Sequence, residues 1–374
     1  MTDQLIAVDP DLYENDDNSY PDDWQSETTS IGSSIYRGLL ENGRRYQSLR
    51  SEEYMYASAN SAPITHLLSS FLSLLSVPDK ESCSLPSDDQ MFETYEAGHL
   101  LTLVLDSERD NPLFRSPIVK NPKHILDLGT GKGVWAVDVA DMFPDATVRG
   151  VDLFPPPVAW MPPNCVLEVD DALQPWTWRE PFDLIYMRIM IGSFSDSEWD
   201  QIYKRCYDNL RPGAWIEQVE ASPVITTDDG SIPEGSILHS WGINTREAAK
   251  KSGRDLDAID KMTDSIRKAG FVDIQEKDYK WPIGPWPRDK KYKEAGTVNA
   301  QHWLSGMEGW CMWLLTKFGS PAPWTKEEVQ VYVANMRKEL RMPRYHAYQR
   351  ARRVWARKPL PNESTGRRKE TGKE

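Results

Sequence analysis

The chain has 374 residues, with 57 acidic and 44 basic side chains and a formal net charge of −13. General nucleic-acid binding requires a basic face, so this charge argues against it. The four scattered cysteines form no CxxC pair and no metal-ligand spacing, which predicts reduced intracellular thiols and no metal site. No signal peptide or membrane-spanning run is expected, so we predict a cytoplasmic protein, with the nucleus as the alternative location.

The N-terminal third is predicted to be a polar tail followed by helices. Residues 1–30 carry nine acids and no Lys or Arg, which is typical of a disordered tail. Apolar residues at helical spacing predict helices over 33–56, 65–75 and 91–105.

A glycine-dense turn follows the first predicted strand, His124–Leu128. Gly129 and Gly131 can adopt positive φ at little cost, so the chain can reverse without a Cβ in the way of a ligand. A helix opens directly after Gly133 and presents unpaired N–H groups to the turn. This arrangement predicts a site for a nucleotide-like or carboxylate-bearing cofactor.

Two familiar glycine loops do not fit this turn. A P-loop needs Ser or Thr after its lysine, and Lys132 is followed by Gly133. A dinucleotide fingerprint needs a glycine where this chain has Val134. The remaining feature is Asp127 at the strand end, which can accept hydrogen bonds from an ammonium and would repel a pyrophosphate. The turn therefore favours a cofactor with an amino-acid end.

Acids also end the next two predicted strands. The second strand closes on Asp152, about 20 residues past the turn, where an acid can bind ribose hydroxyls. The third ends at Asp170 and Asp171, where a carboxylate can accept from an adenine amino group, and the fourth ends at Arg188. Open α/β sheets bind ligands at the carboxyl ends of their strands. These three strands are predicted over 146–153, 166–169 and 182–187.

Further helices and strands fill the rest of the chain. Ser195 with Glu198 and Thr325 with Glu328 form capping boxes that each predict a helix start. Strands are predicted over 214–219, 271–277 and 345–355, and helices over 195–210, around 238–248, over 257–269 and 294–318, and from 325.

Fifteen tryptophans are many for this length, and a large share lies outside the strands with terminal acids. They indicate either an aromatic-lined second surface or a large core. Trp303, Met307 and Trp310 share helical spacing, which favours a core stripe.

Several segments carry a family resemblance: ILDLGTGKGVWAVDVAD, VRGVDLFPPPVAWMPPN, EVDDALQPWTW, FDLIYMR and LRPGAWIEQVE. They resemble the class I S-adenosylmethionine-dependent methyltransferases and, more narrowly, the fungal LaeA-like group. The resemblance implies an α/β, Rossmann-like seven-stranded mixed sheet with strand order 3-2-1-4-5-7-6 and an antiparallel last strand. One departure is Lys132, which stands where the group usually has a small residue.

The resemblance also implies a division of the chain. A disordered acidic tail (1–30) and a helical N-terminal lid segment (31–119) precede a methyltransferase domain (120–358), and a second disordered tail follows (359–374). The domain would carry helical insertions at about 222–256 and 290–342 that form the acceptor region. Three tyrosines of the N-terminal segment either belong to the lid or have an ordinary packing role: Tyr46, Tyr54 and Tyr56.

The implied cofactor is S-adenosyl-L-methionine. Asp171 is favoured over Asp170 for the adenine amine because it directly precedes the small residue Ala172. By motif position, the cofactor contacts are Asp127, Gly129, Thr130, Gly131 and Gly133 around the methionine end, Asp152 at the ribose, Leu153, Asp170, Asp171 and Ala172 at the adenine, and Met187 and Arg188 at the floor.

Methyl transfer from a sulfonium is an in-line displacement, so the protein mainly supplies proximity, orientation and a water-poor site. A hydroxyl or protonated amine acceptor benefits from a general base, and histidine is the usual one at neutral pH. His239 and His302 lie in the predicted acceptor elements and are the candidates. Glu217 and Glu220, at the end of the fifth strand, are alternatives.

Two functions are compatible with these patterns. The first is a methyltransferase acting on an O or N atom of a small molecule, a fungal secondary metabolite, without a nucleic-acid or membrane partner. The second is a LaeA-type nuclear regulator of secondary-metabolite gene expression that acts through protein partners.

Overall fold

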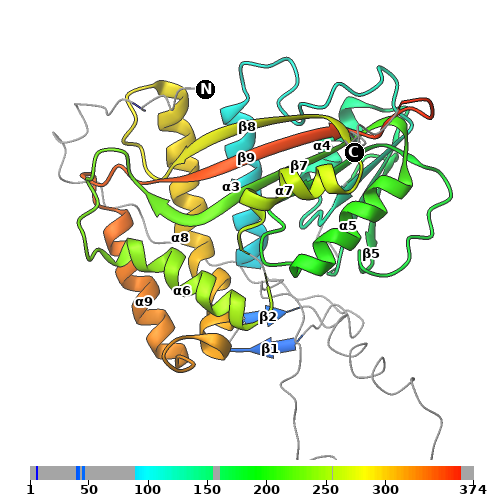
Figure 1. The fold of residues 1–374 in the computed structure, drawn as a ribbon. Helices are drawn as coiled ribbons and strands as arrows, with labels where there is room; N and C mark the ends of the chain where they lie inside the picture. Colours follow the sequence, from blue (N-terminus) through cyan, green and yellow to red (C-terminus); the bar gives the residue numbers. More distant parts are fainter. Residues whose placement is uncertain are drawn as a thin grey trace, which may run out of the picture.

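A mixed seven-stranded sheet forms the centre of the molecule (Figure 1). The computed structural model describes residue 6 and residues 39–42, 44–46, 89–154, 161–254 and 256–363. The strands are β3 (His124–Leu128), β4 (Thr147–Asp152), β5 (Cys165–Val169), β6 (Phe182–Arg188), β7 (Leu210–Thr226), β8 (Val272–Pro282) and β9 (Tyr348–Arg357). They lie in the order β5-β4-β3-β6-β7-β9-β8, and β9 is antiparallel to both of its neighbours. Counted along the chain this order is 3-2-1-4-5-7-6, so the predicted topology is confirmed.

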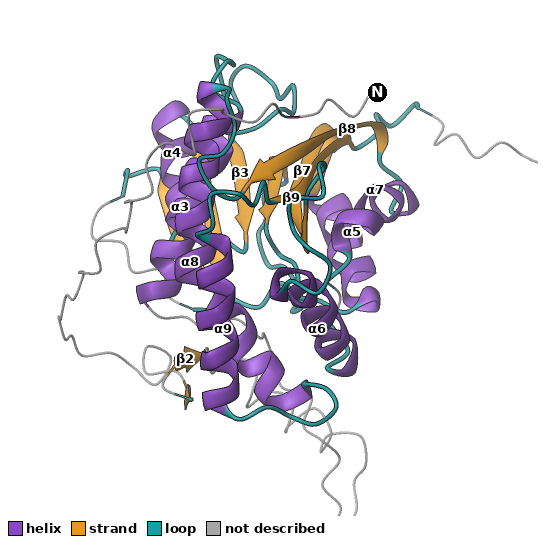
Figure 2. Cartoon of the chain, turned by 90° about the vertical axis from the view of Figure 1, so that its left-hand side faces the viewer, coloured by secondary structure: helices purple, strands orange, loops and turns teal. Residues whose placement is uncertain are grey.

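Helices cover both faces of the sheet (Figure 2). Successive side chains of a strand point to opposite faces, so Ile125 of β3 packs with Trp135 on one face and Leu126 packs with Ile202 on the other. The first face is covered by α3 and α4 and the second by α5 and α7. The helices are α3 (Asp89–Leu105), α4 (Val134–Met142), α5 (Asp196–Asn209), α6 (Ile237–Lys251), α7 (Ala258–Lys268), α8 (Lys290–Phe318) and α9 (Lys326–Leu340).

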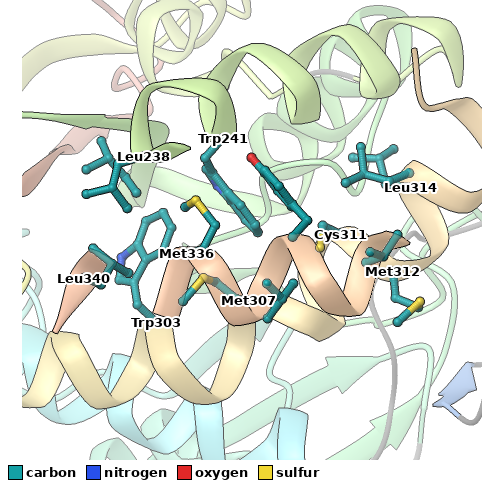
Figure 3. Close-up of a cluster of buried hydrophobic side chains, with 14 of the residues drawn as sticks. Leu238, Trp241, Trp303, Met307, Cys311, Met312, Leu314, Met336 and Leu340 are labelled. Atoms are coloured by element: carbon teal, nitrogen blue, oxygen red, sulfur yellow. The ribbon is translucent and has the colours of Figure 1, made fainter. Parts of the chain in front are cut away.

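A separate hydrophobic cluster joins α6, α8 and α9 (Figure 3). Trp241 of α6 contacts Trp303 of α8, with ring centroids 5.6 Å apart, and stacks on Tyr332 of α9 at 6.2 Å. Helix α3 lies along α8, where Gly306 has no side chain: a Cβ there would come within 2.7 Å of Thr94. These contacts hold α3, α6 and α8 beside the sheet.

Most predicted elements occur, with ends shifted by a few residues. Both capping boxes are present, at Ser195 of α5 and at Thr325 of α9. The fifth strand, β7, is much longer than the predicted 214–219 because it continues past Ala221 and pairs again with β9 at Ile225.

The predicted helix over 33–56 is wrong where the chain is described. Leu39–Glu41 (β1) and Arg44–Tyr46 (β2) form an antiparallel hairpin, with Asn42 in the turn at φ 54°. The predicted helix over 65–75 and the lid candidates Tyr54 and Tyr56 lie outside the described residues. The expected tails also lie outside them, except for residue 6 and for residues 359–363, where Glu363 forms an ion pair with Arg357. Within the part of the chain that is described, no helix is both long enough and apolar enough to cross a membrane.

Candidate functional site

A cavity opens at the carboxyl ends of β3, β4 and β6 and extends towards α6 and α8. The volume open to the centre of a water molecule is about 240 Å³. Of the predicted cofactor contacts, ten line it: Asp127, Gly129, Thr130, Gly131, Asp152, Leu153, Asp170, Asp171, Ala172 and Arg188.

The glycine turn is held against β4 by backbone hydrogen bonds. The N–H groups of Gly129 and Thr130 both donate to the carbonyl oxygen of Val151, at 2.8 and 2.9 Å. Gly129 has φ 73°, and a Cβ there would lie 2.1 Å from Sδ of Met190. The turn therefore requires glycine both for its backbone conformation and for the close approach of the loop after β6.

Asp127 and Asp152 lie at the base of the cavity. Burial raises the pKa of Asp127 to about 6, although Thr130 Oγ1 donates to its Oδ2 at 2.6 Å. Burial also raises the pKa of Asp152, which accepts a hydrogen bond from Gly131 N at 2.8 Å. Burial deprives both carboxyls of water. A cationic or hydroxyl-bearing ligand in the cavity would replace that water with an ion pair or hydrogen bonds.

Asp170 and Asp171 follow β5 and share a backbone turn. Asp171 N donates to Asp170 Oδ1 at 2.8 Å, and Leu173 N donates to Asp171 Oδ1 at 2.9 Å. Asp170 is exposed and Asp171 is buried. Both reach the cavity, so the geometry places either carboxyl within its lining.

Two of the predicted contacts do not reach the cavity. Met187 is fully buried in β6 and packs under the sheet, while its neighbour Arg188 lines the cavity. Gly133 is the N-cap of α4 at φ 85°, and its N–H donates to Thr130 O at 2.9 Å. Gly133 shapes the turn, and Met187 belongs to the core.

Arg188 is the one basic side chain in the described lining of the cavity. Its Nη1 lies 2.8 Å from Nδ1 of His99, and His99 Nε2 lies 2.8 Å from Asp138 Oδ2. Because arginine only donates, Nδ1 of His99 accepts and Nε2–H donates to Asp138. Burial lowers the pKa of His99, so this histidine is a neutral support for the guanidinium, in keeping with a packing role.

The structure separates the two histidine candidates. His302 of α8 lines the cavity, and its Nδ1 lies 2.8 Å from the carbonyl oxygen of Thr94. Burial lowers the pKa of His302 to about 4, so the ring is neutral at pH 7. His239 is exposed on α6 and is absent from the cavity lining, so its prediction as a catalytic residue is not supported by the geometry.

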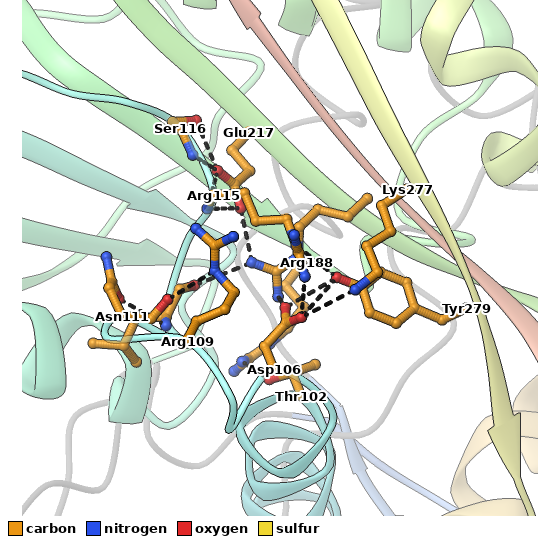
Figure 4. A network of polar contacts seen from close by, with 12 residues as sticks. Thr102, Asp106, Arg109, Asn111, Arg115, Ser116, Arg188, Glu217, Lys277 and Tyr279 are labelled. Atoms are coloured by element: carbon orange, nitrogen blue, oxygen red, sulfur yellow. Dashed lines mark hydrogen bonds and ion pairs between the residues drawn. The ribbon is translucent and has the colours of Figure 1, made fainter. Parts of the chain in front are cut away.

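The alternative bases are both engaged elsewhere. Glu217 is fully buried and accepts hydrogen bonds from the backbone N–H groups of Arg115 and Ser116 and from Arg353 Nη1 at 2.8 Å (Figure 4). Glu220 accepts from Met190 N at 3.1 Å, which ties down the loop after β6. Neither glutamate lines the cavity, so both are corrected to structural roles.

The polar network around Glu217 continues to the end of α3. Asp106 is fully buried and forms ion pairs with Arg115 and, at 3.3 Å, with Arg353. Tyr279 of β8 donates to Asp106 Oδ2 at 2.9 Å (Figure 4). The network therefore fixes α3 to the last three strands, and α3 brings Tyr95 into the cavity wall.

The wall opposite the acids is aromatic. Trp303 is 5.3 Å from Trp310 and 5.6 Å from Trp241 between ring centroids, and all three line the cavity. The predicted core stripe is correct for the buried Trp303 and Met307, but Trp303 and Trp310 also face the cavity. Sequence reasoning also missed Gln349 of β9, which lines the cavity and which no local pattern marks.

The charges of the lining suit a cationic nucleoside better than a phosphorylated one. Asp127, Asp152, Asp170 and Asp171 all face the cavity, against Arg188 alone. A pyrophosphate would meet this acidic base with repulsion, whereas an ammonium and a sulfonium would be attracted. The donor set therefore fits S-adenosylmethionine.

Lys132 does not obstruct the cavity. Its Nζ forms an ion pair with Glu96 Oε1 of α3 at 2.5 Å, and the residue is not part of the lining. The departure from the family pattern thus leads to a contact between the glycine turn and α3.

Known proteins similar to this chain are methyltransferases and regulators of secondary metabolism. Residues 104–278 match a family model described as a methyltransferase domain. The chain is 31% identical to methyltransferase pytC of Aspergillus terreus over 93% of this chain and 96% of that protein. It is 32% identical to the secondary metabolism regulator laeA of Monascus pilosus, covering 90% and 83%, and 31% identical to the probable methyltransferase tdiE of Emericella nidulans, covering 67% and 77%.

The fold and the site define a class I S-adenosylmethionine-dependent methyltransferase. Within that class, the chain belongs to the fungal LaeA-like methyltransferases.

Proposed function

We propose that this protein transfers the methyl group of S-adenosylmethionine to an O or N atom of a small molecule, a fungal secondary metabolite. The supporting observation is that one cavity joins the acidic strand ends to a wall of Trp241, Trp303 and Trp310. A methyl donor bound by the acids would thus face a lining that is predominantly aromatic and apolar, as in small-molecule sites. The bound cofactor supplies an activated methyl on a sulfonium.

The residues of the chain have three tasks in this proposal. Asp127 and Asp152 hold the ammonium and the ribose hydroxyls, respectively. Trp241, Trp303 and Trp310 exclude water and orient the acceptor, which brings the reacting atoms together without a covalent intermediate. His302 accepts the proton that becomes acidic as the acceptor atom is methylated; a base with a pKa of about 4 suffices for that proton.

The proposal also assigns a role to each segment of the chain. We assign residues 31–119 to a lid, 120–358 to the methyltransferase domain with acceptor-forming insertions at about 222–256 and 290–342, and the two ends to tails. The contribution of Tyr95 and Gly98 to the cavity wall supports the lid, and that of Trp241 and Trp303 supports the insertions.

The likeness to regulators named laeA favours a second candidate function. In that reading the same fold acts in the nucleus through protein partners, without a metabolite acceptor. The first candidate operates in the cytoplasm or the nucleus and needs no protein partner.

One experiment separates the two. The protein is incubated with methyl-labelled S-adenosylmethionine, at a concentration too low to saturate Asp152→Ala, and a metabolite extract of the host, with Asp152→Ala as the control. Label in a small molecule, absent with the control, supports the enzyme. Label confined to protein, together with recovery of nuclear partners on affinity purification, supports the regulator.

A further inference from the structure

The charged side chains of the cavity are confined to the strand ends that would hold the cofactor. Among the described lining residues, those from α3, β7, α6, α8 and β9 include no Asp, Glu, Lys or Arg. His302 is neutral at pH 7 because burial lowers its pKa to about 4. The lining of this half offers an ionised acceptor no counter-charge of its own, and the positive charge of Arg188, which reaches His302, also faces Asp127; this half therefore favours a neutral molecule.

The hydrogen-bonding polarity of His302 is fixed by its neighbour. Its Nδ1 lies 2.8 Å from the carbonyl oxygen of Thr94, and a carbonyl oxygen only accepts. The proton must therefore be on Nδ1, and Nε2 carries the lone pair. No described residue forms a hydrogen bond with Nε2, so His302 presents the cavity with an acceptor.

A neighbouring side chain also fixes the orientation of the Gln349 amide, but here the group left for a ligand is a hydrogen-bond donor. Nε1–H of Trp303 donates to Oε1 of Gln349, and an indole nitrogen never accepts. The amide is thereby oriented with Oε1 towards the tryptophan and Nε2 away from it. Gln349 is 4% exposed, and within the described chain its Nε2 has no hydrogen-bond partner. This side chain therefore presents a donor.

We infer that the acceptor is a neutral, planar aromatic molecule that carries a hydroxyl or N–H group and a carbonyl oxygen. The hydroxyl or N–H donates to His302 Nε2, and the carbonyl accepts from Gln349 Nε2. The ring system packs against the wall of Trp303, Trp310 and Trp241, whose rings already contact one another edge to face, in the offset or edge-to-face contacts that aromatic pairs prefer. This inference rests on the proposed function and narrows it to one substrate class.

Gln349 is accordingly a specificity residue, and Trp303 is a positioning residue that acts through it. A polar site discriminates strongly against a ligand that lacks the matching group, because its own buried group is then left unpaired. Loss of the ligand carbonyl should thus weaken binding more than tenfold.

The test uses hydroxychromones, which combine the ring, the hydroxyl and the carbonyl. Binding of 5-, 6- and 7-hydroxychromone is measured by calorimetry in the presence of saturating S-adenosylhomocysteine. Each isomer is compared with the matching methoxychromone, which lacks the donor, and with the matching hydroxychroman, which lacks the carbonyl. We expect at least one isomer to bind at least tenfold more tightly than both of its counterparts.

Two variants assign the effect to residues. Gln349→Met should abolish the preference for chromone over chroman and leave the preference for hydroxyl over methoxy intact. Trp303→Phe frees the amide of Gln349 and should reduce the carbonyl preference to a few-fold. Unchanged affinity for S-adenosylhomocysteine shows that each variant is folded; if Gln349→Met is not folded, Trp303→Phe carries the test.

The inference is overturned if no isomer shows the double preference, or if the carbonyl preference survives in the folded variants. A labelled metabolite without a carbonyl, found in the extract experiment, would refute this inference and leave the proposed function standing. An extract in which no small molecule is labelled, with the cofactor bound, would refute the proposed function itself.

Discussion

Nδ1 of His302, on α8, lies 2.8 Å from the carbonyl oxygen of Thr94, on α3. This contact joins two helices that are about 200 residues apart in the chain and sets the tautomer of the one histidine in the described cavity lining. The hydrogen bond opposes the effect of burial on the ring, and burial is the larger, so the pKa of His302 falls to about 4.

His302→Gln should lower kcat about 100-fold for the acceptor found in the extract experiment, which is the lower end of general-base contributions. Affinity for S-adenosylhomocysteine should not change. The matched control is His239→Gln, on the exposed face of α6, which should retain full activity. A kinetic defect in the control, or none in His302→Gln, would contradict the assignment.

The pH dependence of stability should change in the same variant. The pKa of His302 is lower in the folded chain, about 4, than the ordinary value of 6.5 in the unfolded chain, so unfolding takes up a proton between these values. Stability is therefore lost as pH falls from 6.5 to 4, by up to about 3 kcal/mol. Denaturant unfolding of wild type and His302→Gln at pH 7 and pH 4.5 measures the difference.

Asp127 should make cofactor affinity pH-dependent. Its carboxyl has a pKa of about 6 in the ligand-free protein because it is buried, and only the ionised form attracts an ammonium. Affinity for S-adenosylhomocysteine should fall about tenfold from pH 7 to pH 5, as expected for one proton taken up. Asp127→Asn should bind weakly at both pH values, and calorimetry at a series of pH values distinguishes the two behaviours.

Asp152→Ala should reduce affinity for S-adenosylmethionine about 10- to 100-fold, because two hydrogen bonds from ribose hydroxyls to a charged group are lost. Asp145→Ala removes an equal charge from an exposed position and serves as the control. Calorimetric titration gives both affinities. An unchanged value for Asp152→Ala would show that this acid does not contact the cofactor.

Glu217→Gln should destabilise the protein and spare the cofactor site. The carboxylate is fully buried and paired with Arg353, which is 2% exposed and keeps its ion pair with Asp106, so the change removes one of two partners of a buried cation at a cost of about 2–3 kcal/mol. Glu108→Gln, which breaks a half-exposed pair with Lys291, should cost at most about 1 kcal/mol. Urea unfolding measures both; a loss of turnover without a loss of stability would restore Glu217 as a base.

Much of the sheet could be predicted because its signals are local. Each strand from β3 to β6 is a short segment rich in apolar residues with a charged residue at or next to its carboxyl end, and the order of the sheet followed from the resemblance to a known family. The hairpin of β1 and β2 was missed although Asn42-Gly43 is a strong turn signal for a two-residue hairpin. The helix was predicted because the apolar residues of that segment have helical spacing. In the structure, Glu41 pairs with Arg44 across the turn, and the segment forms a hairpin.

The acceptor half could be predicted only in part, because tertiary contacts create it. His239 and His302 both lie on helices, and nothing in their neighbourhood tells which face meets a cavity. Helical spacing correctly predicted that Trp303 and Trp310 lie on one side of α8. It could not show that this side of the helix borders the cavity as well as the core. Gln349 had no signal at all: its role depends on Trp303, which reaches it from another element.

The match to the shared methyltransferase domain ends at residue 278, whereas His302, Trp303, Trp310 and Gln349 all come later in the chain. In the proposed function, most of the side chains that face the acceptor are thus encoded after the matched domain, and Trp241 is the aromatic one that lies within it. Substitutions in α8 and at the start of β9 are therefore expected to change the acceptor, while the strand ends proposed to bind the donor stay as they are.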